Sequence, residues 1–285
     1  MKAIVLKSHA KLNLYLRVIN KRPDGYHNLK TIFERINLYD DVAFSANRTG
    51  RIKILCDHPQ VPTGPGNLVY KAAAVLRERY QVSQGVAIRI IKRIPVAAGL
   101  AGGSSNAATA LVGLNKVWSL GLTKKEMLDI GNSLGSDIAF FLHDCSWALG
   151  EGRGERITRL NIKSRFWHVL VVPKVKMYTV KVYRGLKLKL TNNKDNANIL
   201  TRYLQKKNIN KIYKYLGNDL EHSIVTIVPS LKNVPRRLKA LGAEGVSFSG
   251  SGPTVFCLLW SRQDAECLKR ILQKRYSQVF VVSTW

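Results

Sequence analysis

Cysteine and histidine are scarce in this chain of 285 residues. The six histidines form no HExxH motif and no zinc-like cluster, and no cysteine belongs to a CxxC pair. This pattern argues against a disulfide-rich scaffold and against a transition-metal site. We therefore expect buried thiols and surface or polar-network histidines. The four cysteines are Cys56, Cys145, Cys257 and Cys267.

Long hydrophobic runs are also missing. Although 46% of the residues are hydrophobic, no run of about 18 apolar residues occurs, so we expect no transmembrane helix. The N-terminal segment MKAIVLKSHAKLNLYL lacks the small-residue cleavage site of a signal peptide and soon alternates polar with apolar residues. We expect a cytoplasmic protein without a membrane partner.

Acidic residues are few, because 18 Asp and Glu stand against 46 Lys and Arg, a net charge of +28. Such a charge invites a nucleic-acid hypothesis. The basic residues are spread along the chain, however, and their densest stretches lack the interleaved aromatics of a single-strand platform. The charge predicts a general attraction for polyanions, including phosphorylated metabolites, and no specific nucleic-acid partner.

The pattern of the first half predicts strands and helices in mixed order. Leu12, Leu14 and Leu16 alternate with polar residues, which predicts a half-buried strand with Lys11 and Asn13 on the face opposite the core. The other elements predicted here are strands at 36–44, 52–56 and 86–94, a helix capped by Asn67 with the apolar face Leu68, Ala72, Val75 and Leu76, a helix beginning at Ser104 or Ser105, and a helix with a capping box at Thr123 and Glu126 that ends near Leu134.

The segment GEGRGE, residues 150–155, is rich in turn-forming residues, and the pattern restarts after it. The second half predicts strands at 168–172, 246–248, 255–260 and 279–282 and helices at 198–206, 231–241 and 265–276. We expect an α+β chain with two domains, 1–160 and 161–285.

A loop of small residues follows the strand predicted at 86–94. Small side chains let backbone N–H groups approach an anion closely, and a helix N-terminus adds its positive dipole end. The loop is therefore a plausible phosphate cradle, although a bare glycine cluster is more often an ordinary connection. GxxxxGK[ST] and GxGxxG are missing, which excludes Walker-type, dinucleotide and protein-kinase loops. The loop residues are Pro95, Val96, Ala97, Ala98, Gly99, Leu100, Ala101, Gly102, Gly103, Ser104 and Ser105.

Five segments along the chain resemble motifs of a known family. The spacing P-x3-G-L-x-x-x-S-S-x-A of this loop resembles the ATP-binding motif of the GHMP kinases. The segments 10–14 (AKLNL), 22–27 (RPDGYH), 135–141 (GSDIAFF) and 247–254 (SFSGSGPT) resemble the diphosphocytidyl-methylerythritol kinases within that group. The departures are small: Ala101 stands where the family usually has Gly, and Ala139 where it usually has Pro.

The resemblance implies a two-domain GHMP kinase fold, with a ribosomal-protein-S5-domain-2-like N-terminal domain and a ferredoxin-like C-terminal domain. It implies that ATP places its phosphates on residues 99–105, with Pro95, Asn67 and Leu68 on the adenine side. Mg²⁺ is expected to neutralise the phosphates, with Ser105 as a candidate ligand.

The resemblance also implies a catalytic pair, Lys11 and Asp137. Asp137 would accept the proton of the attacking hydroxyl, and Lys11 would favour the charged forms. Taken singly, Lys11 is more simply a solvated strand lysine and Asp137 a helix cap.

By the same resemblance, the second substrate is a cytidine diphosphate derivative. Tyr26 and Tyr183 would stack on the two faces of the base, His27 would bind its edge, and Asn13 would contact the methylerythritol portion. Thr179, four residues before Tyr183, is assigned to the same site. The implied reaction transfers the γ-phosphate of ATP to the 2-hydroxyl of 4-diphosphocytidyl-2-C-methyl-D-erythritol, in non-mevalonate isoprenoid precursor synthesis.

Two alternatives stay open. Another GHMP kinase, acting on mevalonate, homoserine or a sugar, would share the ATP loop but would not explain the PDGYH segment. A non-catalytic RNA-binding protein would suit the charge and the resemblance of the expected N-terminal domain to a ribosomal-protein domain. The sequence leaves the choice between a monomer and a homodimer open.

Overall fold

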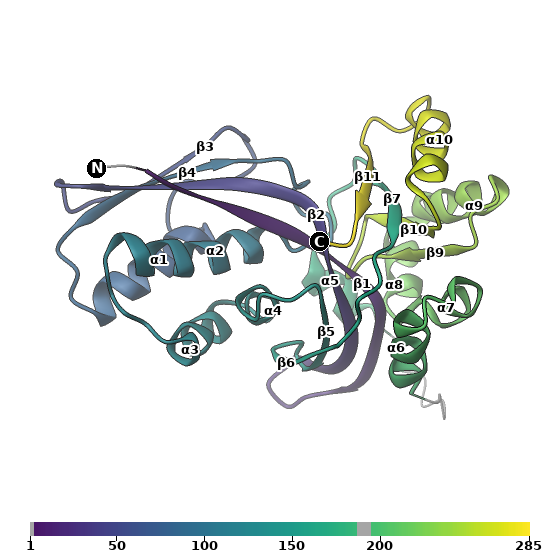
Figure 1. Ribbon diagram of the computed structural model, residues 1–285, viewed down its shortest axis with the longest axis horizontal. Coiled ribbons are helices and arrows are strands. Elements are labelled where there is room, and N and C mark those ends of the chain that lie inside the picture. The colour runs from purple at the N-terminus through teal and green to yellow at the C-terminus, as the bar shows by residue number, and fades with distance from the viewer. Residues whose placement is uncertain (1–2, 187–194) are drawn as a thin grey trace. The chain divides into compact units, whose positions relative to one another are not determined.

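The computed structural model describes residues 3–186 and 195–285 (Figure 1), which divide into two compact units. Two long strands, β1 (Ile4–Lys21) and β2 (His27–Asn47), contribute residues to both units. The segments of the two units therefore alternate along the chain. The predicted domains 1–160 and 161–285 are each continuous in sequence, and they stay a prediction. Unit 1 comprises Met1–Ala10, Leu38–Val96 and Ala101–Cys145, and unit 2 comprises Lys11–Asn37, Ala97–Leu100 and Ser146–Trp285.

Unit 1 packs helices against a short sheet (Figure 1). The second half of β2 pairs antiparallel with β4 (Gly85–Ile91), and β3 (Ile52–Cys56) pairs parallel with β4. Small residues let helix and sheet come close: a β-carbon at Gly113 would collide with the Phe44 ring. The helices are α1 (Leu68–Arg79), α2 (Gly102–Val117), α3 (Lys124–Leu134) and α4 (Ile138–Leu142).

Two helix starts of unit 1 confirm the sequence prediction. The side chain of Asn67 accepts the Val69 N–H at 2.8 Å and caps α1. Thr123 and Glu126 form a complete capping box for α3, which ends at Leu134 as expected. These caps involve residues within three positions of each other, so local sequence is enough to predict them.

Two details of these helices correct the prediction. The helix expected from Ser104 or Ser105 begins at Gly102, and its N-cap is Ala101 in the left-handed conformation, with no side-chain cap. In α1, Leu68 and Val75 are only partly buried, while Val69 and Ala73 join Ala72 and Leu76 in the core. The buried face is thus rotated slightly from the one expected.

Unit 2 contains a four-stranded antiparallel sheet in the order β11-β7-β10-β9. Its hydrophobic core joins the sheet to the helices that pack on it, with Val169, Ile224, Leu238 and Leu268 among the buried residues. These elements are β7 (Trp167–Val171), β9 (Gly245–Phe248), β10 (Val255–Leu259), β11 (Val279–Ser283), α8 (Glu221–Ile227), α9 (Asn233–Ala240) and α10 (Arg262–Gln273).

The rest of unit 2 lies beside the first halves of the two long strands. β5 (Trp147–Gly152) pairs with β2 and with β6 (Arg156–Arg159), and β8 (Gly217–Asn218) runs parallel to β1. The remaining elements are α5 (Thr179–Arg184), α6 (Ala197–Gln205), α7 (Ile209–Tyr215) and the 3₁₀ helix η1 (Pro229–Lys232).

The α+β class expected from the sequence is confirmed, and the strands and helices predicted in the second half are found within a few residues of their expected ends. The turn expected over GEGRGE is partly wrong, because residues 150–152 continue β5. Several short elements were not predicted, namely β5, β6, β8, α4, α5, α7 and α8. Across the described ranges 3–186 and 195–285, no helix is long and apolar enough to cross a membrane.

Candidate active site

Lys11 and Asn13 lie in the most deeply buried part of β1. Their side chains are 4% and 2% exposed, and every residue from Ala10 to Leu16 is buried. The predicted half-buried strand is therefore wrong, since both faces of β1 are covered at this point. The expected shared face is confirmed, because the Lys11 ammonium donates a hydrogen bond to the side-chain oxygen of Asn13.

Neighbouring groups fix the orientation of Asn13. Its side-chain amide donates to the Thr31 hydroxyl at 2.8 Å, and that hydroxyl donates to the backbone oxygen of Tyr15 at 2.6 Å. The amide nitrogen is thus used, and the oxygen must point toward Lys11. The Lys11 ammonium also lies 5.5 Å from the centre of the Phe33 ring. The ammonium is held in one place by its surroundings.

The middle of the glycine-rich loop, residues 97–100, is attached to the same part of unit 2. The Thr254 hydroxyl donates to the Ala98 carbonyl at 2.6 Å, the Ser249 hydroxyl donates to the Gly99 carbonyl at 3.0 Å, and the Lys11 N–H donates to the Leu100 carbonyl at 3.2 Å. Three consecutive carbonyls of the loop therefore accept hydrogen bonds, and these bonds define the shape of the loop.

Glycine is required where this loop meets segment 247–254. Gly99 has φ +75°, and a β-carbon there would collide with the Ser249 carbonyl oxygen. A β-carbon at Gly250 would lie 3.2 Å from the Asn13 side-chain oxygen and 3.4 Å from the Lys11 ammonium. The ammonium of Lys11 thus lies beside the backbone of Gly250, which has no side chain. The motif at 247–254 gives no local sign of these roles of Ser249 and Gly250.

The end of the loop belongs to unit 1 and forms the start of α2. The first intrahelical hydrogen bond runs from the Ser105 N–H to the Ala101 carbonyl at 2.9 Å. The N–H groups of Gly102, Gly103 and Ser104 precede this bond, so they are not part of the helix's own hydrogen-bond series. Gly103 is exposed, and a β-carbon there would meet nothing within 4 Å. Such a helix start fits the phosphates of a nucleotide.

Ser105 does not fit the metal role suggested for it. It is 1% exposed, and its hydroxyl accepts a hydrogen bond from the Ser8 hydroxyl at 2.8 Å. Among the described residues, His, Cys, Asp and Glu side chains form no group of three that could hold a metal ion. Mg²⁺ bound with a nucleotide usually keeps several waters and takes other ligands from the phosphates, so a site of that kind needs few protein ligands.

The residues expected on the adenine side all lie in unit 1. Asn67 and Leu68 form the start of α1, where the Asn67 amide also donates to the Pro62 carbonyl at 2.6 Å. Pro95 follows β4 and is partly buried. Their contact with adenine stays a prediction.

Asp137 occupies the N-cap position of α4 and is partly buried, but its side chain makes no capping hydrogen bond. The interpretation of Asp137 as an ordinary helix cap is therefore wrong. Asp137 belongs to unit 1 and Lys11 to unit 2, and their joint role stays a prediction.

The structure brings together two of the aromatic residues assigned to the acceptor. The rings of His27 and Tyr183 lie 5.2 Å apart, although 156 positions separate the two residues in the chain. Burial, followed by the nearby charge of Lys21, lowers the pKa of His27. The neutral imidazole that results at neutral pH can both donate and accept a hydrogen bond, which suits the edge of a base.

Tyr26 lies on the turn just before His27 and is 54% exposed. The Asp24 carboxylate accepts hydrogen bonds from the Arg22 guanidinium at 2.8 Å and from the Tyr26 N–H at 3.1 Å, and the Arg22 bond lowers the pKa of Asp24. The guanidinium of Arg153 lies 5.1 Å from the centre of the Tyr26 ring. Tyr26 therefore lies on a hydrogen-bonded turn with its ring largely open to solvent.

Thr179 begins α5, and its hydroxyl lies 2.9 Å from the hydroxyl of Ser251. This hydrogen bond ties the helix that carries Tyr183 to segment 247–254. Sequence reasoning missed Ser251 and Arg153, since neither follows from the spacing of any one motif.

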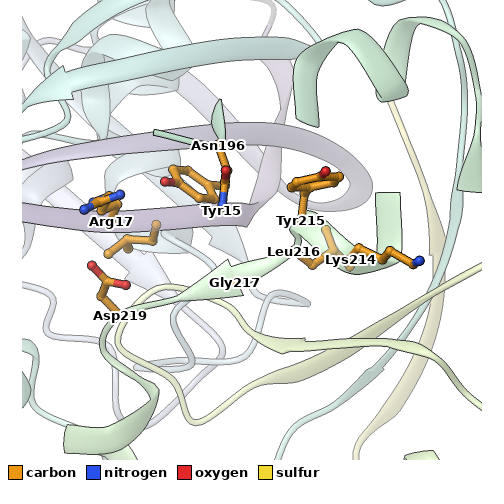
Figure 2. Close-up of a pocket in the computed structure, with 9 residues that line it drawn as sticks. Tyr15, Arg17, Asn196, Lys214, Tyr215, Leu216, Gly217 and Asp219 are labelled. Atoms are coloured by element: carbon orange, nitrogen blue, oxygen red, sulfur yellow. The ribbon is translucent and has the colours of Figure 1, made fainter. Parts of the chain in front are cut away.

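A separate pocket of about 290 Å³ lies in unit 2. Figure 2 shows the residues that line it, and none of them is predicted for the site. Tyr215 in its wall stacks on Tyr203, with ring centres 5.5 Å apart. Asp219 accepts the Val18 N–H at 2.9 Å, and burial raises its pKa. The tyrosine pair joins α6 to α7, and the Asp219 bond holds the end of β8 beside β1. The lining residues are Tyr15, Leu16, Arg17, Asn196, Lys214, Tyr215, Leu216, Gly217 and Asp219.

Comparison with protein families gives two matches along the chain. The GHMP kinases N terminal domain matches residues 67–144, and the GHMP kinases C terminal domain matches residues 200–278.

Individual proteins match over almost the full length. A 4-diphosphocytidyl-2-C-methyl-D-erythritol kinase of Acetivibrio thermocellus is 39% identical over 284 residues, which covers 100% of both chains. The protein of the same name from Geobacillus kaustophilus is 41% identical over 278 residues, 97% of this chain and 95% of its own.

Solved structures match as well. A crystal structure of 4-(cytidine 5'-diphospho)-2C-methyl-D-erythritol kinase superposes with a TM-score of 0.84 at 29% identity and covers 98% of both chains. A homoserine kinase from Cytophaga hutchinsonii superposes with a TM-score of 0.76 at 17% identity, covering 100% of this chain and 95% of its own, which shows likeness of fold alone.

Proposed function

The chain belongs to the GHMP kinases, and within them to the 4-diphosphocytidyl-2-C-methyl-D-erythritol kinases, and on this basis we propose the reaction that it catalyses. It transfers the γ-phosphate of ATP to the 2-hydroxyl of 4-diphosphocytidyl-2-C-methyl-D-erythritol, a step of the non-mevalonate isoprenoid pathway. The GHMP kinase fold expected from the motifs is confirmed by the two family matches and the superposition at a TM-score of 0.84.

The buried ammonium of Lys11 is the observation that carries this function. It is 4% exposed, it is oriented by Asn13, and it lies beside the bare backbone of Gly250. A lysine in this setting cannot serve as a solvated surface charge. Phosphoryl transfer is catalysed mainly by fixed positive charge and positioning, and a held ammonium supplies both.

The proposed reaction forms a bond between the acceptor oxygen and the γ-phosphorus and breaks the bond from that phosphorus to the leaving oxygen of ADP. Asp137 accepts the proton of the attacking hydroxyl, and Lys11 stabilises the developing negative charge. The N–H groups at the start of α2 bind the phosphates. Mg²⁺, when bound with ATP, would supply charge neutralisation of the phosphates.

In the acceptor site, we assign the cytosine base to Tyr26, His27 and Tyr183. The exposed ring of Tyr26 offers a stacking face, and the adjacent rings of His27 and Tyr183 offer a hydrogen-bonding edge and a second aromatic surface. Asn13, fixed by Thr31, is assigned to the methylerythritol portion. We place the reaction in the cytoplasm, where ATP is supplied.

The deciding experiment measures ADP release with Mg-ATP and each of four acceptors: the cytidyl-methylerythritol diphosphate, mevalonate, homoserine and galactose. We expect turnover with the first acceptor alone. Turnover with another acceptor would keep the kinase class and overturn the roles of Tyr26, His27 and Tyr183. No ADP release with any of the four acceptors, together with a steeply salt-dependent affinity for RNA, would favour the non-catalytic alternative instead.

A further inference from the structure

Asp40 is a fully buried carboxylate in the part of β2 that belongs to unit 1. One of its oxygens accepts the N–H groups of Arg93 at 2.7 Å and Ile94 at 2.8 Å. Its other oxygen accepts the Lys92 ammonium and, at 2.9 Å, the side-chain amide of Asn106. Four donors on one buried carboxylate satisfy its hydrogen-bonding capacity and compensate its charge.

These donors come from both ends of the glycine-rich loop. Arg93 and Ile94 immediately precede Pro95, where the loop begins, and Asn106 lies in the first two turns of α2, just after the loop ends. The two ends also pack directly, because a β-carbon at Gly102 would lie 2.9 Å from the Lys92 ammonium and 2.9 Å from the Ile94 side chain. Asp40 therefore links the residues entering the loop to the helix leaving it.

A second branch of the network reaches the serine at the end of the loop. The Asn106 amide donates to the Ser8 hydroxyl at 2.9 Å as well as to Asp40, and the Ser8 hydroxyl donates to Ser105 at 2.8 Å. Ser8, Ser105 and Asn106 are all at most 3% exposed. The first turns of α2 are thus fixed by side-chain hydrogen bonds that are closed to solvent.

We propose that Asp40 and Asn106 are positioning residues for the nucleotide: by holding the two ends of the loop 95–105 at a set separation, they keep the N–H groups at the start of α2 aimed at the ATP phosphates. The inference rests on the proposed ATP-binding function. Neither residue needs to touch the nucleotide, because the effect is transmitted through Arg93, Ile94 and the first turns of α2. A loop whose ends are already fixed loses less conformational freedom when it binds phosphate.

The chain offers a matched control on the same helix. Asn115 ties the far end of α2 to the following loop, since its amide donates to the Leu122 carbonyl at 3.1 Å and its oxygen accepts the Leu122 N–H at 2.9 Å. Asn106→Ala and Asn115→Ala remove the same side chain from one helix. The first loses the bonds to Asp40 and Ser8, and the second loses the two bonds to Leu122 and a weaker one to the Met127 sulfur at 4.0 Å. Only the first change disconnects the phosphate-binding end.

The test compares Mg-ATP affinity by titration calorimetry, without acceptor, in the wild-type chain and the two variants, with the Tm of each. We expect Asn106→Ala to raise Kd for Mg-ATP about tenfold, the size of effect that a hydrogen bond to a charged group supports. We expect Asn115→Ala to leave Kd unchanged even if it lowers Tm as much. In turnover assays, KM for ATP should rise in Asn106→Ala while KM for the cytidyl acceptor stays the same.

An unchanged Kd in Asn106→Ala, or an equal rise in both variants, would overturn the inference and reduce the network to a structural one. If Asn106→Ala does not fold, Asp40→Asn takes its place, because it keeps the side-chain shape while an amide replaces the acceptor facing Lys92 and Asn106. Failure of the wild-type chain to bind Mg-ATP would instead refute the proposed function itself, and the inference with it.

Discussion

The side-chain ammonium of Lys11 donates a hydrogen bond to the side-chain oxygen of Asn13, two positions along the same strand, and both residues are almost wholly buried. Because the Asn13 amide is used by Thr31, the oxygen has no alternative orientation that keeps both contacts. The pair therefore positions one positive charge in the interior of unit 2. This fixed charge is the basis of the first prediction.

Lys11→Met should lower kcat by about 10²- to 10⁴-fold, the range typical of a lost charge-stabilising or proton-transfer group. Methionine has a similar length but no charge, so Kd for Mg-ATP should be nearly unchanged. The measurement is steady-state ADP release together with calorimetric binding of Mg-ATP. Lys7→Met is the control, because Lys7 is an exposed lysine of the same strand and should retain full activity. Near-normal kcat in Lys11→Met would refute the catalytic role.

Asp137→Asn should also lower kcat by about 10²-fold or more, since the amide cannot accept the proton of the attacking hydroxyl. The side chain makes no capping hydrogen bond to α4, so the substitution should leave the helix start intact. Asp129→Asn, at an exposed position of α3, serves as the control. If Asp137→Asn lowered Tm but left kcat intact, Asp137 would have to be given a structural role in place of a catalytic one.

Tyr183→Leu should raise KM for the cytidyl acceptor by roughly 5- to 150-fold, because stacking on a base contributes about 1–3 kcal/mol. KM for ATP should stay the same, and Tyr183→Phe should retain near-normal values since it keeps the ring. Tyr178→Leu is the matched control: Tyr178 precedes α5, is 60% exposed, and is not assigned to the base. Equal values of KM for the acceptor in Tyr183→Leu and the wild type would remove Tyr183 from the site.

The sequence predicts those features of the fold that are set by nearby residues. The cap of α1 by Asn67 and the capping box of α3 depend on side chains within three positions of the backbone they bind. The start of α2 is different. Its first residue, Gly102, packs against Lys92 and Ile94, a contact between separate elements that leaves no local pattern.

In the candidate site as well, local motifs predict some features, while contacts between distant residues decide the others. The motifs identify Lys11 and Asn13, but their alternation with leucines predicts one open face of β1, where the structure covers both. No spacing rule could pair His27 with Tyr183, 156 positions apart, or Asp40 with Asn106, 66 positions apart. Such contacts depend on how strands and helices pack. A motif identifies functional residues but does not indicate which distant residues they contact.

The pH dependence of acceptor binding should follow His27. Burial and Lys21 hold the pKa of His27 below its ordinary value of 6.5, so the folded chain binds this proton more weakly than the unfolded chain does. The contribution of neutral His27 to stability is therefore complete above pH 6.5 and is lost as the pH falls below it. KM for the cytidyl acceptor should be flat at neutral pH and rise as the pH falls through the lowered pKa.

Lys21→Met tests the smaller of the two causes of this shift. Removing the charge should raise the pKa of His27, and the rise in KM should then begin at a higher pH. Profiles of KM against pH, with an NMR titration of the His27 ring, measure both quantities. His222→Gln, at an exposed position, should leave the profile unaltered. A KM that stays constant while His27 titrates would show that its protonation does not matter to binding.

Ala101→Gly should stabilise the chain. Ala101 has φ 54° and ψ 31°, a left-handed conformation that disfavours a residue with a β-carbon by about 1–2 kcal/mol. Glycine removes this strain but makes the unfolded chain more flexible, which offsets about 0.4–1 kcal/mol of the gain. The net increase in the free energy of unfolding should be of order 1 kcal/mol or less.

Ala98→Gly is the control: Ala98 lies in the same loop, is 3% exposed and does not have a positive φ, so glycine should destabilise the chain there. Urea unfolding of the three proteins measures both effects. A loss of stability in Ala101→Gly equal to that in Ala98→Gly would mean that the neighbours of Ala101, rather than its own backbone, decide how this loop turns into α2.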